Sequence, residues 1–341
     1  MLQSTSSGAE ALSALEWSKV LAGYRIPRLR RSLLEIAVTV FPFLVLWLLG
    51  WVSVQQGWWP LLVLIWFPAA GLLVRLFLIQ HDCGHGSFFR NKAVNDWVGR
   101  ALGVVTLTPY DSWRHAHAIH HAGSGHLDHR GIGDISTLTV DEYQSRPFLG
   151  RLLYRLYRHP LTLFVVGPAY QFLLRHRLPA SSLRLEWSNW RGPLITNIAL
   201  IALVGGAIWL AGLGPFLWVQ LPITLIAASI GVWLFYVQHQ FEETVWARSP
   251  QWNRHEAALH GSSHYDLPRI LRWFSANIGV HHVHHLCSGI PYYNLQRVLR
   301  DHPVLRDVSR LTLLESAGCV RLVLWDEAAH RLVSFKELRV R

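Results

Sequence analysis

Four stretches of this chain are long and apolar enough to cross a lipid bilayer, and they restrict the fold more than any other feature. They cover residues 33–54, 58–79, 194–213 and 216–237. A membrane-spanning helix needs about 20 predominantly apolar residues. Only Glu35 and Arg75 carry a charge within these stretches, and Arg75 lies one turn from the end of its stretch, where its head group can extend to the interface. We therefore expect four spanning helices.

Very short links join these stretches in two pairs. The links lie around Gln55–Gly57 and Gly212–Pro215, and neither contains Lys or Arg. Basic residues occur instead before the first stretch, between residues 80 and 193, and after residue 237. Because basic loops stay on the cytoplasmic side of a membrane, we expect two helical hairpins with both termini in the cytoplasm.

The composition supports a membrane protein and argues against a nucleic-acid-binding one. Hydrophobic residues make up 51% of the chain and charged residues 16%, against about 25% charged residues in an ordinary soluble domain. The net charge of +11 therefore marks cytoplasmic loops near anionic lipid. The three cysteines, Cys83, Cys287 and Cys319, have no paired spacing, which favours a reducing compartment over a disulfide framework. The N-terminus predicts no cleaved signal peptide.

Two further apolar stretches, 93–110 and 154–174, are interrupted by Thr, Pro, Gly and Arg. We expect interfacial helices there, with a fifth and sixth span as the alternative. The tail segment RLVLWDEAAHRLVSF alternates apolar and polar residues around a polar turn, which predicts a small β-hairpin.

The predicted fold is an all-α membrane protein: two transmembrane helical hairpins, interfacial helices and a cytoplasmic histidine-rich cap. The predicted divisions are a cytoplasmic N-terminal segment (1–32), a membrane domain (33–305, with the cap from 80–193 and 238–305) and a cytoplasmic C-terminal tail (306–341).

All 20 histidines lie outside the four apolar stretches, and three clusters of them share a spacing. The clusters are His81-Asp-Cys-Gly-His85, His117-Ala-Ile-His120-His121 and His281-His-Val-His284-His285. Positions i, i+3 and i+4 of a helix lie on one face, so H-x-x-H-H directs three imidazoles to one point and H-x-x-x-H directs two. Structural zinc takes only four ligands, so eight converging nitrogens suit two metal ions.

The ligand type indicates oxidation chemistry. Soluble di-iron bundles use Glu together with Glu-x-x-His, whereas neutral imidazoles hold divalent iron without cancelling its charge. A centre at the cytoplasmic end of two hairpins can receive electrons from soluble carriers and an alkyl chain from the bilayer. An unactivated methylene has no acidic proton, so its oxidation needs a metal–oxygen oxidant.

Other histidine-rich proteins fit the pattern less well. A metal transporter places its ion sites near the bilayer midplane, and bis-histidine haem also requires ligands inside the spans, where this chain has no histidine. A membrane zinc protease needs the motif H-E-x-x-H, which does not occur in the sequence.

The three clusters, together with GSFF, SGHLDHRGIGDISTLTVDEY, YVQHQFE and IPYYNL, resemble the membrane fatty acid desaturase family over residues 35–330. The resemblance is greatest to the bacterial Δ12-like branch. It implies a non-haem di-iron centre of two iron ions that uses O2 to introduce a cis double bond into an acyl chain. The ligands it implies are His81, His85, His117, His120, His121, His239, His281, His284 and His285. Related hydroxylases, acetylenases, conjugases and ketolases share these clusters and remain alternatives.

The resemblance also implies partners and a location. No HPGG motif of a fused haem domain is present, so the electrons come from a separate ferredoxin, rubredoxin or cytochrome. The substrate is an acyl lipid, an acyl-CoA or an acyl carrier protein, and its length and double-bond position stay open. The expected location is a bacterial inner membrane, with the active site on the cytoplasmic side.

Carboxylates close to the clusters are candidates to orient the ligands, because metal-bound histidines usually donate their second N–H to a carboxylate or carbonyl. Asp134 is the preferred candidate. The full set is Asp82, Asp128, Asp134, Glu242 and Glu243. His115 and His282 fall outside the ligand spacing, and we expect them beside the ligands rather than among them.

Overall fold

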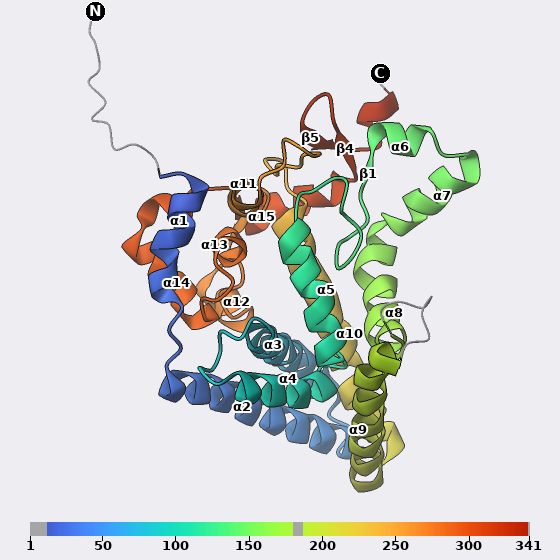
Figure 1. Ribbon diagram of the computed structural model, residues 1–341. Coiled ribbons are helices and arrows are strands. Elements are labelled where there is room, and N and C mark those ends of the chain that lie inside the picture. The colour runs from blue at the N-terminus through green and yellow to red at the C-terminus, as the bar shows by residue number, and fades with distance from the viewer. Residues whose placement is uncertain (1–11, 180–186, 340–341) are drawn as a thin grey trace, which may run out of the picture.

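The computed structural model describes residues 12–179 and 187–339 (Figure 1). In this part of the chain, four helices are long and apolar enough to span a membrane, as predicted. They are α2 (Leu29–Gln55), α3 (Trp59–Gly84), α9 (Trp187–Ala211) and α10 (Leu213–His239). The turns between them use Gly57 at φ +69° and Gly212 at φ +85°, a left-handed conformation that glycine adopts without steric cost. Both expected hairpins are therefore present.

Two of the spanning helices continue past their apolar stretches to the histidines. The second apolar stretch ends at Ile79, and α3 continues to Gly84 and therefore contains His81. The fourth apolar stretch ends at Val237, and α10 continues to His239. Hydropathy measures only the apolar part of a helix, so it does not include these last residues. These two histidines are therefore held by the spanning helices themselves.

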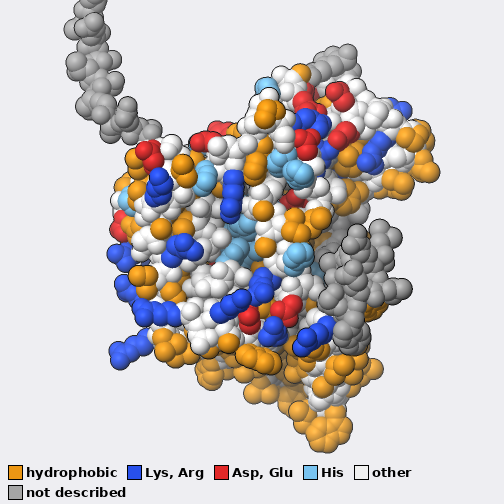
Figure 2. All heavy atoms as spheres, in the orientation of Figure 1, with side chains coloured by type: hydrophobic (Ala, Val, Ile, Leu, Met, Phe, Trp, Pro, Cys, Tyr) orange, Lys and Arg blue, Asp and Glu red, His pale blue; other side chains and the backbone are white. Residues whose placement is uncertain are grey.

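The spanning helices present a broad apolar surface. In α9, no residue of the most apolar window is buried inside the protein, and Trp209 is 84% exposed. Figure 2 shows hydrophobic side chains gathered at the bottom of the molecule, where Figure 1 places α9. At the same end, the Trp51 indole of α2 donates a hydrogen bond to the Ala211 carbonyl of α9 over 3.1 Å. Such a surface is typical of helices that face lipid.

The charged residue of the second span does not extend to the interface as predicted. Arg75 is only 2% exposed. Its guanidinium forms an ion pair with Glu35 of α2 and donates a hydrogen bond to Thr39 over 3.1 Å. The Tyr292 hydroxyl donates to the same Glu35 carboxylate over 3.0 Å. A charge inside a span is costly unless it is paired, so the two opposite charges satisfy each other.

Short helices form a cap at the histidine end of the spans (Figure 1). Those before α9 are α1 (Ala14–Leu21), η1 (Ala22–Tyr24), α4 (Lys92–Val105), α5 (Tyr110–Gly123), α6 (Val140–Gln144), α7 (Phe148–Tyr157), η2 (Thr162–Val166), α8 (Gly167–Leu173) and η3 (Arg175–Arg177). Those after α10 are α11 (Arg254–His260), α12 (Arg269–Phe274), α13 (His281–Leu286), α14 (Tyr292–Asp301), η4 (Pro303–Arg306), α15 (Leu313–Ser316), η5 (Ala317–Arg321) and η6 (Glu337–Arg339). The interrupted stretches 93–110 and 154–174 thus form short helices, and neither qualifies as a fifth span within the described residues.

Two small sheets join the cap to the C-terminal tail. The expected hairpin is present as β4 (Leu324–Asp326) antiparallel to β5 (Arg331–Val333). A third strand, β1 (Leu138–Thr139), pairs parallel to β4, with Leu138 opposite Leu324. The second sheet pairs β2 (His264–Asp266) with β3 (Arg310–Thr312) in parallel. The tail is therefore packed against the segment that follows the second histidine cluster.

Candidate metal centre

Nine histidines converge where α3, α5, α10 and α13 meet, and they form two groups. We call them the histidine centre. The five-histidine group consists of His81, His85, His117, His121 and His284, and the four-histidine group consists of His120, His239, His281 and His285. Within each group, one ring nitrogen of every member lies within 4.8 Å of the others. The structure thus brings together all nine residues that the sequence and the resemblance singled out.

Each three-histidine cluster is divided between the two groups, whereas the spacing predicted that its members share one point. His117 and His121 of α5 belong to the five-histidine group, but His120 belongs to the other. Adjacent helical residues diverge by about 100°, so His120 and His121 face different ways. The same division separates His284 from His285 on α13. One helix therefore serves both groups.

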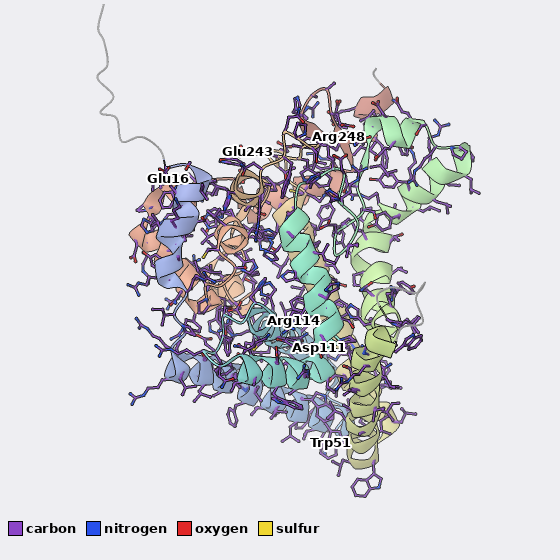
Figure 3. All side chains as sticks on the ribbon, in the orientation of Figure 1. Glu16, Trp51, Asp111, Arg114, Glu243 and Arg248 are labelled. Atoms are coloured by element: carbon purple, nitrogen blue, oxygen red, sulfur yellow. The ribbon has the colours of Figure 1, made fainter. Side chains whose placement is uncertain are left out.

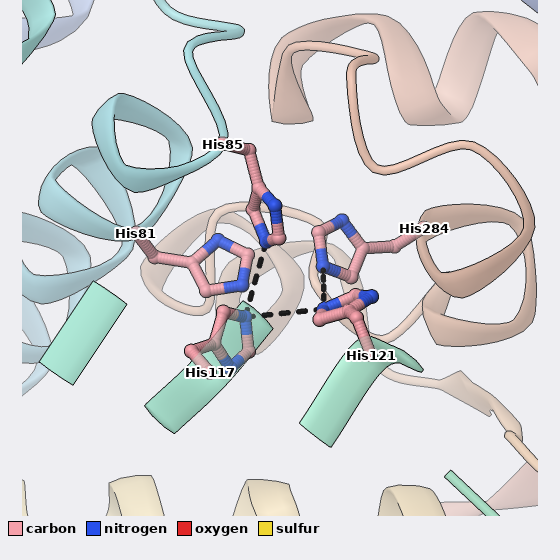
Figure 4. A group of neighbouring side chains, drawn as sticks. All are labelled: His81, His85, His117, His121 and His284. Atoms are coloured by element: carbon pink, nitrogen blue, oxygen red, sulfur yellow. Dashed lines mark hydrogen bonds between the residues drawn. The ribbon is translucent and has the colours of Figure 1, made fainter. Parts of the chain in front are cut away.

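The five-histidine group places ring nitrogens unusually close together (Figure 4). The Nε2 atom of His117 lies 3.0 Å from that of His85 and 3.1 Å from that of His121. The Nε2 atom of His121 lies 3.2 Å from that of His284. A neutral imidazole has one N–H and one lone pair, so a single Nε2 cannot serve two such neighbours well. A metal cation between them would accept all of these lone pairs.

The four-histidine group has the same character. The Nε2 atom of His239 lies 3.1 Å from that of His120 and 3.0 Å from that of His281. The Nε2 atom of His285 is buried and has no hydrogen-bond partner among the described residues. An unpartnered buried nitrogen is costly, so this group also fits a cation.

The two groups are in contact, and burial favours the neutral form of His121, His284 and His285. The His121 and His285 rings, one from each group, stack with centroids 4.1 Å apart and planes inclined by 15°. Burial, followed by the neighbouring imidazoles, lowers the pKa of His121 and of His285 well below the usual value. Burial likewise lowers the pKa of His284. Neutral imidazole is the form that binds metals.

Two of the five candidate carboxylates reach histidines of the centre. Asp134 accepts a hydrogen bond from Nδ1 of His120, which leaves Nε2 of that ring directed into the four-histidine group. Asp82 lies 3.4 Å from Nδ1 of His81 and accepts a hydrogen bond from the Tyr292 backbone over 2.7 Å. Both arrangements hold a ring in one orientation.

The other three carboxylates lie elsewhere. Asp128 binds the Arg248 guanidinium over 2.7 Å and the Ser249 backbone over 3.0 Å. Glu242 and Glu243 are exposed. Figure 3 shows Glu243 and Arg248 at the outer edge of the cap. None of these side chains has a hydrogen bond to the histidine centre within the described residues.

His115 and His282 also lie outside the centre. His115 is exposed on α5. His282 is fully buried but faces away, because its Nε2 donates a hydrogen bond to the Leu305 carbonyl over 2.8 Å. His282 is thus a neighbour of the ligands in sequence but does not contact the centre. Its hydrogen bond connects α13 to η4 instead.

Two residues that shape the centre were not predicted from the sequence. The Trp113 indole stacks on the His117 ring, with centroids 4.6 Å apart and planes inclined by 17°. A Cβ atom at Gly84 would lie 2.8 Å from this indole, so the glycine in HDCGH permits the close approach of α5. The only available signal was a small residue directly before His85.

A cavity of about 560 Å³ adjoins the histidine centre. It lies between α3, α5, α8 and α10, and it is lined mainly by apolar side chains such as Phe77, Phe172 and Phe235. His81, His117 and His281 line it as well. Ligand sites usually combine apolar walls with a few polar groups, so an extended alkyl chain can lie against the imidazoles here.

Comparison with known proteins agrees with this site. The family model described as fatty acid desaturase matches residues 56–311. A fatty acid desaturase of Bacillus subtilis is 42% identical over 322 residues, which cover 94% of this chain and 91% of that protein. An sn-1 oleoyl-lipid 12-desaturase of Arthrospira platensis is 28% identical over 269 residues, which cover 73% of this chain and 70% of that protein. An sn-1 acyl-lipid omega-3 desaturase (ferredoxin) of Synechocystis is 31% identical over 251 residues, which cover 70% of this chain and 66% of that protein.

The family match covers most of the chain and includes all three histidine clusters, and the match to the Bacillus protein extends over nearly its whole length. With its four apolar helices and its two histidine groups, the chain belongs to the fatty acid desaturase family and is a membrane oxidoreductase that acts on fatty acyl chains.

Proposed function

We propose that this desaturase uses two iron ions, held by the nine histidines, to form a cis double bond in an acyl chain of a membrane lipid. The observation that carries the proposal is the contact between two converging histidine groups and an apolar cavity. For each double bond, the reaction consumes O2, two electrons and two protons, removes two hydrogens from adjacent carbons, and releases two water molecules.

The donor set supports iron. Nine imidazoles without a carboxylate suit a divalent transition metal. Zinc would also bind, but it has no redox chemistry. When bound, iron supplies the activation of O2 that removal of hydrogen from an unactivated methylene requires.

The side chains bind and orient the reactants. The aromatic residues of α3, α8 and α10 enclose the alkyl chain and keep water away from it. His81, His117 and His281 face this cavity, so the reacting carbons lie against the five- and four-histidine groups. Asp134 keeps the proton of His120 on Nδ1, which leaves the Nε2 lone pair available.

The names of the relatives support the substrate and the donor. Two relatives are named as acting on oleoyl or acyl lipids, and one of these names includes ferredoxin. We propose an acyl lipid rather than acyl-CoA or acyl carrier protein, and a ferredoxin rather than a rubredoxin or a cytochrome. The basic loops support a bacterial inner membrane with the cap in the cytoplasm.

The experiment is expression in a bacterial host that lacks polyunsaturated lipids, followed by fatty-acid profiling. We expect acyl chains with one additional cis double bond. His239→Ala should abolish this product and reduce bound iron, because His239 contacts both His120 and His281. His115→Ala and His282→Ala should keep bound iron and measurable product, because neither ring points into the centre.

Two outcomes would contradict the proposal. Hydroxylated chains as the only product would assign the site to a hydroxylase. Near-full activity and iron content in His239→Ala, together with loss of both in His282→Ala, would show that the ligand assignment is wrong.

A further inference from the structure

A second pocket, of about 260 Å³, also adjoins the histidine centre, but it is polar and shares no lining residue with the apolar cavity. Ser18 and Arg25 line it from the N-terminal segment, and Arg254 and His255 line it from α11. Residues 285–289, at the end of α13 and beyond, complete it. The centre therefore has two different approaches, one apolar and one polar.

The pocket is basic. Arg25 and Arg254 are exposed, and neither has an ion pair with a carboxylate within the described residues. No acidic residue lines the pocket. Two other arginines of the cap do have such partners: Arg248 pairs with Asp128, and Arg310 pairs with Asp266. The positive charge of the pocket is therefore available to a partner.

Arg25 lies against the loop that follows α13. A Cβ atom added at Gly289 would be 2.5 Å from Nε of Arg25, so the absence of a side chain at Gly289 leaves room for the guanidinium at this side of the pocket.

The inner wall of this pocket is His285, a member of the histidine centre. Its ring stacks on His121 at 4.1 Å, and its centroid lies 4.5 Å from that of His281 and 4.8 Å from that of His239. An electron delivered beside His285 thus arrives next to members of both groups.

We propose that this basic pocket is the docking site of the electron donor, a small acidic iron–sulfur protein that approaches the centre at His285. The inference rests on the proposed function, which requires two electrons for each double bond. Each encounter oxidises one reduced donor by one electron, so two encounters supply the pair. Complementary charge at the rim steers and orients such encounters.

The position of the pocket favours a protein partner over an anionic lipid. It lies among α1, α11 and α13, whereas the apolar surface of α9 occupies the other end of the molecule (Figure 1). A soluble acidic protein can reach such a place without entering the membrane.

The test compares two double variants of the purified, iron-loaded enzyme in a neutral detergent. Arg25→Glu with Arg254→Glu reverses the charge of the pocket. Arg146→Glu with Arg151→Glu makes the same change in net charge at exposed residues that do not line it. Binding of a [2Fe–2S] ferredoxin is measured directly at several salt concentrations, and the KM for ferredoxin is measured alongside. Melting temperature and iron content establish that both variants are folded.

We expect the pocket variant to bind ferredoxin at least tenfold more weakly, with a similar rise in KM and a smaller dependence of binding on salt. A single turnover driven by dithionite should be unchanged, because a small reductant needs no docking. The control variant should stay within twofold of the wild-type enzyme.

Equal ferredoxin binding by the pocket variant and the wild-type enzyme would overturn the proposal. If instead the pocket variant binds ferredoxin normally and loses activity only in vesicles that contain phosphatidylglycerol, the pocket takes a lipid head group and the proposal is also wrong. Failure of the wild-type enzyme to form product with any reductant would count against the proposed function, and the binding result would still decide the docking site.

Discussion

At the scale of single residues, Asp134 has the clearest influence on the histidine centre. Its carboxylate accepts the Nδ1 hydrogen of His120, and the Nε2 atom of the same ring lies 3.1 Å from that of His239. An ionised acceptor strengthens such a hydrogen bond and makes the imidazole a better electron-pair donor.

We therefore expect Asp134→Asn to lower the affinity of the metal-free protein for Fe²⁺ by about 10–100-fold. The measurement is an anaerobic Fe²⁺ titration, and excess iron should restore much of the product. Asp128→Asn is the matched control, since Asp128 contacts Arg248 and Ser249 instead. An unchanged affinity in Asp134→Asn, or an equal loss in both variants, would show that this hydrogen bond does not support metal binding.

The sequence predicted the candidate histidines better than their arrangement. Helical spacing identified eight of them, and the family resemblance added His239. Spacing could not predict which group each one joins, because that depends on how α5 and α13 are rotated about their axes. Asp134 was the preferred carboxylate and does contact His120, but spacing offers no geometric reason to choose it over Asp128, since both lie in the loop after α5.

At the scale of elements, α10 forms one wall of the apolar cavity. Gly231, Leu234, Phe235 and Gln238 all line the cavity. The last three follow Gly231 by three, four and seven residues, so all four residues lie on one face of the helix. A Cβ atom added at Gly231 would meet nothing within 4 Å. Gly231 lies eight residues before His239, which is about 12 Å along the helix axis.

Gly231→Leu should consequently occupy the cavity below the histidines and shift the enzyme toward shorter acyl chains. We expect the ratio of C18 to C16 products to fall at least fivefold in a mixed-substrate assay, measured by mass spectrometry. Gly205→Leu is the control: Gly205 of α9 also has open space around it but does not line the cavity. The same product ratio in both variants would mean that the acyl chain does not pass Gly231.

The elements themselves differed in how well the sequence could predict them. The four long apolar runs were sufficient to predict the spans and the hairpins, because the hydropathy of a segment depends only on its own residues. The ion pair of Arg75 with Glu35 and the pairing of β1 with β4 join residues far apart in the chain. Such contacts depend on packing, and a two-residue strand such as β1 has no recognisable pattern.

At the scale of the whole molecule, the short links and the histidine centre lie at opposite ends of the spanning helices. Gln56 and Gly214 are exposed at the link end, and Gln251 is exposed in the cap. If the cap is cytoplasmic, as the basic loops indicate, the two sites at the link end face the periplasm.

A membrane-impermeant maleimide added to intact cells should thus label Gln56→Cys and Gly214→Cys. Gln251→Cys should react only after the cells are opened. A Cys287→Ser background removes the partly exposed native thiol, since Cys83 and Cys319 are buried. Labelling of Gln251→Cys in intact cells would place the histidine centre on the periplasmic side.

The pairing of β1 with β4 has a consequence for biosynthesis. β1 begins four residues after Asp134, and its partner β4 lies close to the C-terminus. A ribosome therefore completes both hairpins, and all nine histidines, before it makes the strand that steadies the segment carrying Asp134. A nascent chain can be fully inserted in the bilayer and still lack this support. The segment that carries Asp134 therefore reaches its final place only after the rest of the fold has been made, and a chain that ends before β4 lacks the pairing partner of β1.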